Sequence, residues 1–168
     1  MKLSSVVFLA AALPSVALAQ LPPFVELRIP KPPTVGTGEN GSFLAYELHV
    51  TSFMGQQFTV KSIDVMTAAP DRRVLLSVTD SLLARAVARP GVANITAPDR
   101  LTLPGGSRGV FFLWVPVDAR SAPTAIQHRL TIDVGSGDSV RTQQIEGAVV
   151  PVTASAVVIG PPLRGGVC

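Results

Sequence analysis

The hydrophobic pattern of the chain switches at short intervals between strict alternation and continuous apolar runs. Residues 44–50 are apolar at every second position, which predicts a strand with one buried face. Residues 109–117 follow a Pro-Gly-Gly turn signal and are apolar on both alternating faces. This pattern predicts a central strand that is covered on both sides, with Trp114 buried against the apolar face of 44–50.

Further strands are expected wherever short apolar stretches are bounded by Gly, Pro or polar clusters. In 58–66 the apolar alternation slips by one residue, which predicts a β-bulge. Residues 135–138, Gly-Ser-Gly-Asp, have the composition of a hairpin turn. Residues 30–40 contain three prolines and two glycines without periodicity and are interpreted as a loop or edge crossing. The other expected strands are 24–29, 74–78, 101–103, 128–134, 140–150 and 152–159.

One segment has helical rather than strand periodicity. Leu82, Leu83, Ala86 and Val87 recur at helical spacing within 80–89. Asp80 or Ser81 is available as an N-cap, and Pro90-Gly91 ends the segment. With about eight strands and this single short crossing helix, the chain is predicted to be all-β, an immunoglobulin-like antiparallel β-sandwich.

The N-terminal residues have the pattern of an export signal. Lys2 precedes an apolar stretch, and the small-x-small sequence Ala-Leu-Ala ends at residue 19. The expected organisation is a signal peptide over 1–19, a β-sandwich domain over 20–160 and a truncated linker or tail over 161–168. We therefore expect an exported protein, periplasmic or extracellular, with no membrane anchor after signal cleavage.

Charge and cysteine content narrow the functional classes. The formal net charge of the 168 residues is only +3, and the basic residues are scattered along the chain, so no nucleic-acid partner is expected. Arg28, Lys31, Arg72 and Arg73 are interpreted as solvated charges rather than a basic edge. Cys168 is the only cysteine, which excludes an intrachain disulfide and leaves stability to the core.

Few residues offer catalytic chemistry. His49 and His128 are the only histidines, and neither has a Cys, His or acid at metal-ligand spacing. They are interpreted as a surface histidine and a hydrogen-bonded edge histidine. Glu47 and Asp64 lie on expected strands and could face one another, but solvated carboxylates are the preferred interpretation. We therefore assign no catalytic, cofactor-binding or metal-binding residue, expect no cofactor, and predict a protein that is not an enzyme.

Several segments together resemble a known family. These segments occur in the following order: Phe24-Val-Glu-Leu-Arg-Ile-Pro-Lys-Pro-Pro33, Leu44-Ala-Tyr-Glu-Leu-His-Val-Thr51, Leu103-Pro-Gly-Gly-Ser-Arg108, Val110-Phe-Phe-Leu-Trp-Val115, Gln127-His-Arg-Leu130 and Gly160-Pro-Pro-Leu-Arg-Gly-Gly166. The set resembles the β-sandwich region that precedes a lysostaphin-like zinc peptidase domain in exported bacterial proteins. The resemblance covers most of 24–166, and the peptidase domain itself is absent.

The resemblance implies a non-catalytic accessory module of a cell-envelope peptidase-like protein. Its expected role is to pack against a partner, either the peptidase-like domain or another envelope protein. The zinc motifs of the family match neither His49 nor His128, so no zinc residue carries over. Two alternatives stay open: an independent ligand- or protein-binding sandwich domain, and a small hydrolase with an unrecognised site.

Overall fold

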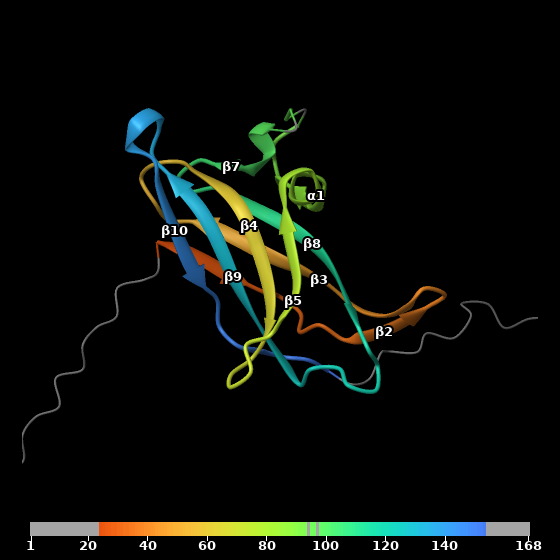
Figure 1. Ribbon diagram of the computed structural model, residues 1–168. Coiled ribbons are helices and arrows are strands. Elements are labelled where there is room, and N and C mark those ends of the chain that lie inside the picture. The colour runs from red at the N-terminus through yellow and green to blue at the C-terminus, as the bar shows by residue number, and fades with distance from the viewer. Residues whose placement is uncertain (1–23, 94, 97, 154–168) are drawn as a thin grey trace, which may run out of the picture.

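The computed structural model describes residues 24–93, 95–96 and 98–153, which form two antiparallel sheets packed face to face (Figure 1). The all-β sandwich expected from the sequence is confirmed. The expected signal peptide, the tail 161–168 with Cys168, and most of the strand expected at 152–159 lie outside the described residues. No helix within the described ranges is long and apolar enough to cross a membrane.

The first sheet, here called sheet 1, has the strand order β1-β3-β8-β6. Strand β2 pairs with the same edge of β3 as β1 does, but β2 lies along the N-terminal part of β3 and β1 along its C-terminal part. Its long central pair, β3 with β8, is in continuous register from Ser42 opposite Val117 to Thr51 opposite Arg108. The strands of sheet 1 are β1 (Val25–Arg28), β2 (Val35–Gly38), β3 (Gly41–Ser52), β6 (Val87–Ala88) and β8 (Arg108–Val117).

The second sheet, sheet 2, has the order β10-β9-β4-β5, with β11 added to β9 and β7 added to β4. The expected bulge is confirmed, because the pairing of β4 with β9 shifts register between Val60 and Ser62. The hairpin expected at 135–138 is also confirmed and joins β9 to β10. The strands of sheet 2 are β4 (Phe58–Thr67), β5 (Val74–Thr79), β7 (Thr102–Leu103), β9 (Ala125–Val134), β10 (Arg141–Glu146) and β11 (Val150–Pro151); short 3-10 turns span η1 (Pro98–Leu101) and η2 (Gly137–Ser139).

The core lies between the inner faces of the two sheets. The alternate apolar positions of β3 are buried, as its pattern predicts, and pack with those of β8, β4 and β9. The fully buried side chains include Leu44, Leu48, Ile63, Phe111, Leu130 and Ile132. Because burial of such side chains is the main favourable term in folding, this layer accounts for the stability of a domain whose described residues contain no cysteine.

The central strand differs from expectation on one face. Phe111, Leu113 and Val115 point into the core, but Trp114 on the opposite face is 63% exposed and Phe112 is 47% exposed. The prediction that Trp114 is buried against β3 is therefore wrong. Sheet 1 has no covering layer over this face within the described residues, and an apolar side chain on a strand gives no indication of which face is covered.

The expected helix is present but shorter. Helix α1 (Asp80–Ala86) connects β5 of sheet 2 to β6 of sheet 1, which confirms the crossing. Its N-cap is Thr79, without a side-chain capping bond, rather than Asp80 or Ser81. The helix ends before Val87 because Val87 and Ala88 pair with Phe111 and Val110 of β8 as strand β6.

Two segments differ from the expectation based on the sequence. Part of 30–40 forms β2, which pairs with the start of β3, so the segment is not wholly a loop. The expected strand 140–150 is interrupted after Glu146, and Pro151, which was expected to separate two strands, is the last residue of β11. The last described residue, Thr153, bonds back to the start of β2: its N–H donates to Pro33 O at 2.9 Å.

Candidate functional site

An exposed aromatic cluster occupies the outer face of sheet 1. Phe112 and Trp114 are two residues apart on β8, so their side chains leave the sheet on the same side. Phe43 on β3 packs against Trp114 with ring centroids 4.9 Å apart and ring planes tilted by 43°. We call Phe43, Phe112 and Trp114 the aromatic face.

Strand register and glycines determine how these rings lie. Ala45 is the Cα partner of Trp114, and its small side chain leaves the indole uncovered. The ring of Phe43 lies over the edge strand β2, where a Cβ added to Gly36 would be 3.2 Å from Phe43 Cε2. The glycine therefore leaves room for Phe43 to lie beside Trp114.

Polar groups border the aromatic face along β3. Glu47 is the Cα partner of Phe112, and His49 is the partner of Val110. His49 Nε2 and Glu47 Oε2 are 3.0 Å apart, within hydrogen-bonding distance. An apolar centre with a polar border is the usual anatomy of a protein interface.

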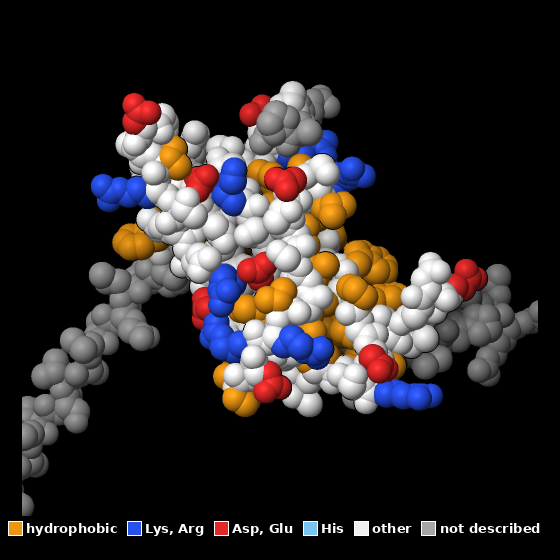
Figure 2. Space-filling view, viewed as in Figure 1, with side chains coloured by type: hydrophobic (Ala, Val, Ile, Leu, Met, Phe, Trp, Pro, Cys, Tyr) orange, Lys and Arg blue, Asp and Glu red, His pale blue; other side chains and the backbone are white. Residues whose placement is uncertain are grey.

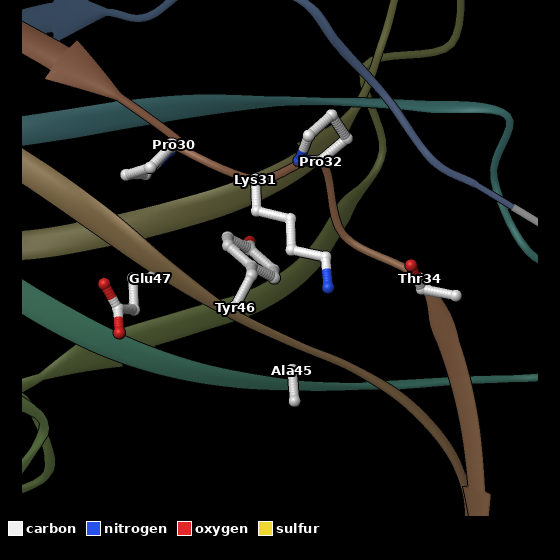
Figure 3. A pocket seen from close by; sticks show the side chains of 7 residues that line it. All are labelled: Pro30, Lys31, Pro32, Thr34, Ala45, Tyr46 and Glu47. Atoms are coloured by element: carbon white, nitrogen blue, oxygen red, sulfur yellow. The ribbon is translucent and has the colours of Figure 1, made fainter. Parts of the chain in front are cut away.

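A surface hollow of about 370 Å³ opens at the edge of β3 beside this face (Figure 3). It is lined by Pro30, Lys31, Pro32 and Thr34 from the connection between β1 and β2, and by residues 45–47 of β3. We call this hollow the edge gap. In Figure 3 the Lys31 side chain runs across it with its ammonium group on the Thr34 side, whereas Glu47 lies at the opposite end.

The edge gap results from the prolines. Strand β1 pairs with β3 as far as Arg28 opposite His49, and β2 resumes the pairing at Val35 opposite Leu44. Between these points the chain leaves the sheet edge, because proline has no N–H to donate to a ladder. Residues 45–48 of β3 are thus without a neighbouring strand on that side.

A buried polar pair lies behind the edge gap, in the core. Tyr46 Oη and His128 Nε2 are 2.7 Å apart, and His128 is 2% exposed. Burial lowers the pKa of His128 to about 4 and raises the pKa of the Tyr46 hydroxyl far above its ordinary value. Both groups are therefore neutral at pH 7, and the pair has a structural rather than an ionic character.

Charged groups of both signs are distributed over the face of the described residues that Figure 2 draws, where basic and acidic side chains are interspersed. Arg72 and Arg129 both bind the Glu146 carboxylate on sheet 2. The pKa of Glu146 is lowered mainly by the hydrogen bond from Arg72, and Arg129 lowers it further. Figure 2 therefore gives no sign of the concentrated basic surface that binds nucleic acid.

The candidate acid–base residues are placed apart. His49 lies on the outer face of sheet 1, as expected, but the expectation of an edge position for His128 is wrong, because β9 lies between β10 and β4. Glu47 and Asp64 do not face one another: Glu47 is on sheet 1, and Asp64 accepts a hydrogen bond from Ser77 on sheet 2. No group of three His, Cys, Asp or Glu residues within the described ranges could hold a metal ion.

The sequence indicated neither of the two surface features. The pattern of 109–117 predicts that Phe112 and Trp114 are covered, because the type of side chain does not reveal the covered face, and it gives no indication of Phe43. The edge gap depends on where β1 and β2 each stop pairing with β3. Three prolines in 30–33 were the available signal, since each removes a donor from a strand.

The chain matches no known family model and no curated protein. Among solved structures it is similar to the X-ray structure of Northeast Structural Genomics Consortium target SoR45, with a TM-score of 0.39 and 8% sequence identity. The similarity covers 84% of this chain and 92% of that one. At this level the likeness carries no argument about function.

Proposed function

We propose that the protein is a non-catalytic β-sandwich module that packs against a partner domain through the aromatic face. The partner has an apolar surface of its own and belongs to an exported, peptidase-like protein of the cell envelope. The observation that carries the proposal is the exposure of Trp114 and Phe112 beside Phe43 on one face of sheet 1. The association with a peptidase and with export rests on the sequence resemblance.

Solvent contact is unfavourable for these rings. Trp and Phe each bury about 150–250 Å² when covered, and aromatic residues are enriched at the centres of interfaces. Contiguous exposed apolar groups with a polar border are typical of surfaces that meet another protein. Glu47 and His49 provide such a border on β3.

The positions of the titratable groups favour a binding role over catalysis. His128 is held in the core by Tyr46, and Asp64 is bonded to Ser77 on the outer side of sheet 2. General acid–base catalysis needs such groups to converge on a reacting atom at hydrogen-bond distance. These residues point to different parts of the molecule, which supports an accessory module rather than a hydrolase.

The test is titration of the protein with a purified lysostaphin-like peptidase domain from one of the resembling proteins. Trp114 is the only tryptophan, so its emission reports directly on the proposed face. We expect a blue shift on binding, because the exposed indole becomes buried, and a loss of affinity of at least about tenfold in Trp114→Ala measured by calorimetry.

A matched control is Val74→Ala, which truncates an exposed apolar side chain on β5 of the other sheet. This variant should bind like the wild type. An absence of binding at high micromolar concentration, or equal losses in Trp114→Ala and Val74→Ala, would overturn the proposed packing. If a soluble glycan strand shifts the emission and the peptidase domain does not, the protein is an independent ligand-binding sandwich.

A further inference from the structure

The main-chain groups of β3 alternate between its two neighbours. The Ser52 N–H donates to Ser107 O at 2.9 Å, just before β8, and the next N–H, that of Phe53, donates to Phe24 O at 2.8 Å, just before β1. The register of β3 is continuous with both strands up to these residues. The odd-numbered residues of β3 therefore direct their N–H and C=O groups away from β8, and those of Glu47 point into the edge gap.

The position opposite Glu47 has lost its pairing strand. Arg28 is the partner of His49, so Pro30, two residues further along, would be the partner of Glu47 if β1 continued. Proline has no N–H and cannot donate to the Glu47 carbonyl. In the part of the chain that the structure describes, no main-chain hydrogen bond joins Glu47 to the segment 29–34.

The edge gap also contains a positively charged side chain, that of Lys31. Lys31 forms none of the four ion pairs found among the described residues. Its ammonium group lies on the Thr34 side of the gap, and the Glu47 carboxylate lies at the other end (Figure 3). A ligand that spans the gap therefore meets positive charge at one end and hydrogen-bond acceptors at the other.

We propose that the edge gap binds the C-terminal end of an extended peptide. The peptide main chain supplies hydrogen-bond partners for the N–H and C=O groups of Glu47, as in the addition of a strand to a sheet edge. Its terminal carboxylate pairs with Lys31. This is a binding site separate from the aromatic face, and it does not rest on the function proposed above.

The geometry favours a chain end over the middle of a strand. β1 pairs with β3 up to His49 and β2 resumes at Leu44, so the unpaired edge is open only between them. A strand that continued along β3 would collide with β2 at one end of the gap and with β1 at the other, so the gap admits only a few residues that end at Lys31, and the rest of the peptide must leave the sheet edge before β1. A volume of about 370 Å³ lies at the low end of the range for ligand sites and suits a few small residues.

The test is an NMR titration of ¹⁵N-labelled protein with N-acetyl-trialanine that has a free carboxylate, and with the same peptide as its C-terminal amide. We expect a saturable shift of the Glu47 amide with the acid at millimolar concentration and about tenfold weaker binding of the amide. Lys31→Met should remove this preference for the acid. Phe112→Ala, on the aromatic face, should retain it.

The matched control is Lys61→Met, because Lys61 lies on β4 of the other sheet, 3.9 Å from Asp133. This variant should bind the acid like the wild type. The proposal is overturned if the Glu47 amide does not respond, if acid and amide bind equally, or if Lys31→Met has no effect. It is also overturned if acetate alone produces the full shift of the Glu47 amide, because the site would then recognise a carboxylate without a peptide.

Discussion

The hydroxyl of Tyr46 and Nε2 of His128 lie 2.7 Å apart in the core and connect the two sheets of the sandwich. Their rings meet edge to face, with centroids 5.6 Å apart. Tyr46 belongs to β3 and His128 to β9, so the pair is a polar link within a mainly apolar layer. Buried polar groups are tolerated when they satisfy each other, and each then depends on its partner.

Tyr46→Phe removes one member of this pair and leaves His128 Nε2 without its partner. We expect the free energy of unfolding to fall by about 1–3 kcal/mol, the usual cost of an unsatisfied buried polar group. Urea denaturation followed by circular dichroism measures the change. The double variant Tyr46→Phe with His128→Leu should recover part of the loss, and strict additivity of the two single changes would contradict the link.

The link also makes stability depend on pH. Burial lowers the pKa of His128 from 6.5 to about 4, so the unfolded state binds more protons than the folded state between these values. The contribution of His128 is fully present above pH 6.5 and is lost progressively as the pH falls toward 4, by up to about 3 kcal/mol. Urea midpoints measured from pH 7 to pH 4.5 should show this decline.

A second group titrates in a different window. The hydrogen bond from Arg72 lowers the pKa of Glu146 below 4.5, so its contribution persists above that pH and is lost only below it. The interval from pH 6.5 to 4.5 therefore isolates His128. His128→Leu should flatten the decline in this interval, and an unchanged slope in that variant would contradict the assignment.

Trp114 and Leu113 are neighbours on β8 that differ in burial. Leu113→Ala opens a cavity in the core and should cost about 2–5 kcal/mol of the free energy of unfolding. Trp114→Ala removes an exposed side chain and should cost less than about 1 kcal/mol, mainly its contact with Phe43. Denaturation midpoints of the two variants test this, and the wild-type tryptophan emission should be that of a solvated indole.

Two glycines in the β9–β10 connection offer a further comparison. Gly135 has a φ of +105°, and a Cβ there would lie 2.7 Å from Ser139 O. Gly137 has a φ of +56°, a region that other residues enter at a cost of about 1–2 kcal/mol, and its added Cβ meets nothing within 4 Å. Gly135→Ala should therefore lower the melting temperature more than Gly137→Ala. Equal losses of melting temperature would show that the positive φ of the two glycines, and not the contact with Ser139 O, determines the cost of the substitution.

The sequence predicted those features that depend on local alternation. The buried face of β3, the bulge at Val60 to Ser62 and the crossing helix all follow from spacing within about ten residues. The covered face of β8 could not be predicted, because Phe111 and Phe112 are chemically identical and only the second sheet distinguishes them. The helix end also depended on a distant partner, since Val87 pairs with Phe111.

The candidate sites were harder to predict for the same reason. Tyr46 and His128 are 82 residues apart, and nothing in either segment identifies the other. The edge gap arises from the absence of pairing opposite Glu47. The registers of β1 and β2 against β3 determine where pairing stops, and they depend on contacts between segments that are distant in the sequence. The prolines in 30–33 indicate a crossing. The same sequence pattern fits a crossing that lies close to the sheet edge and one that leaves a hollow beside it.

The contact of Thr153 with Pro33 and Thr34 has a consequence for synthesis. Thr34 and Thr153 are 119 residues apart and share a side-chain hydrogen bond of 2.6 Å. A chain that leaves the ribosome N-terminus first cannot close this contact until nearly all of the sandwich has emerged, and translation supplies only about 5–20 residues per second. The start of β2 must therefore wait several seconds for its last neighbour, a period in which this part of the sheet edge is incomplete.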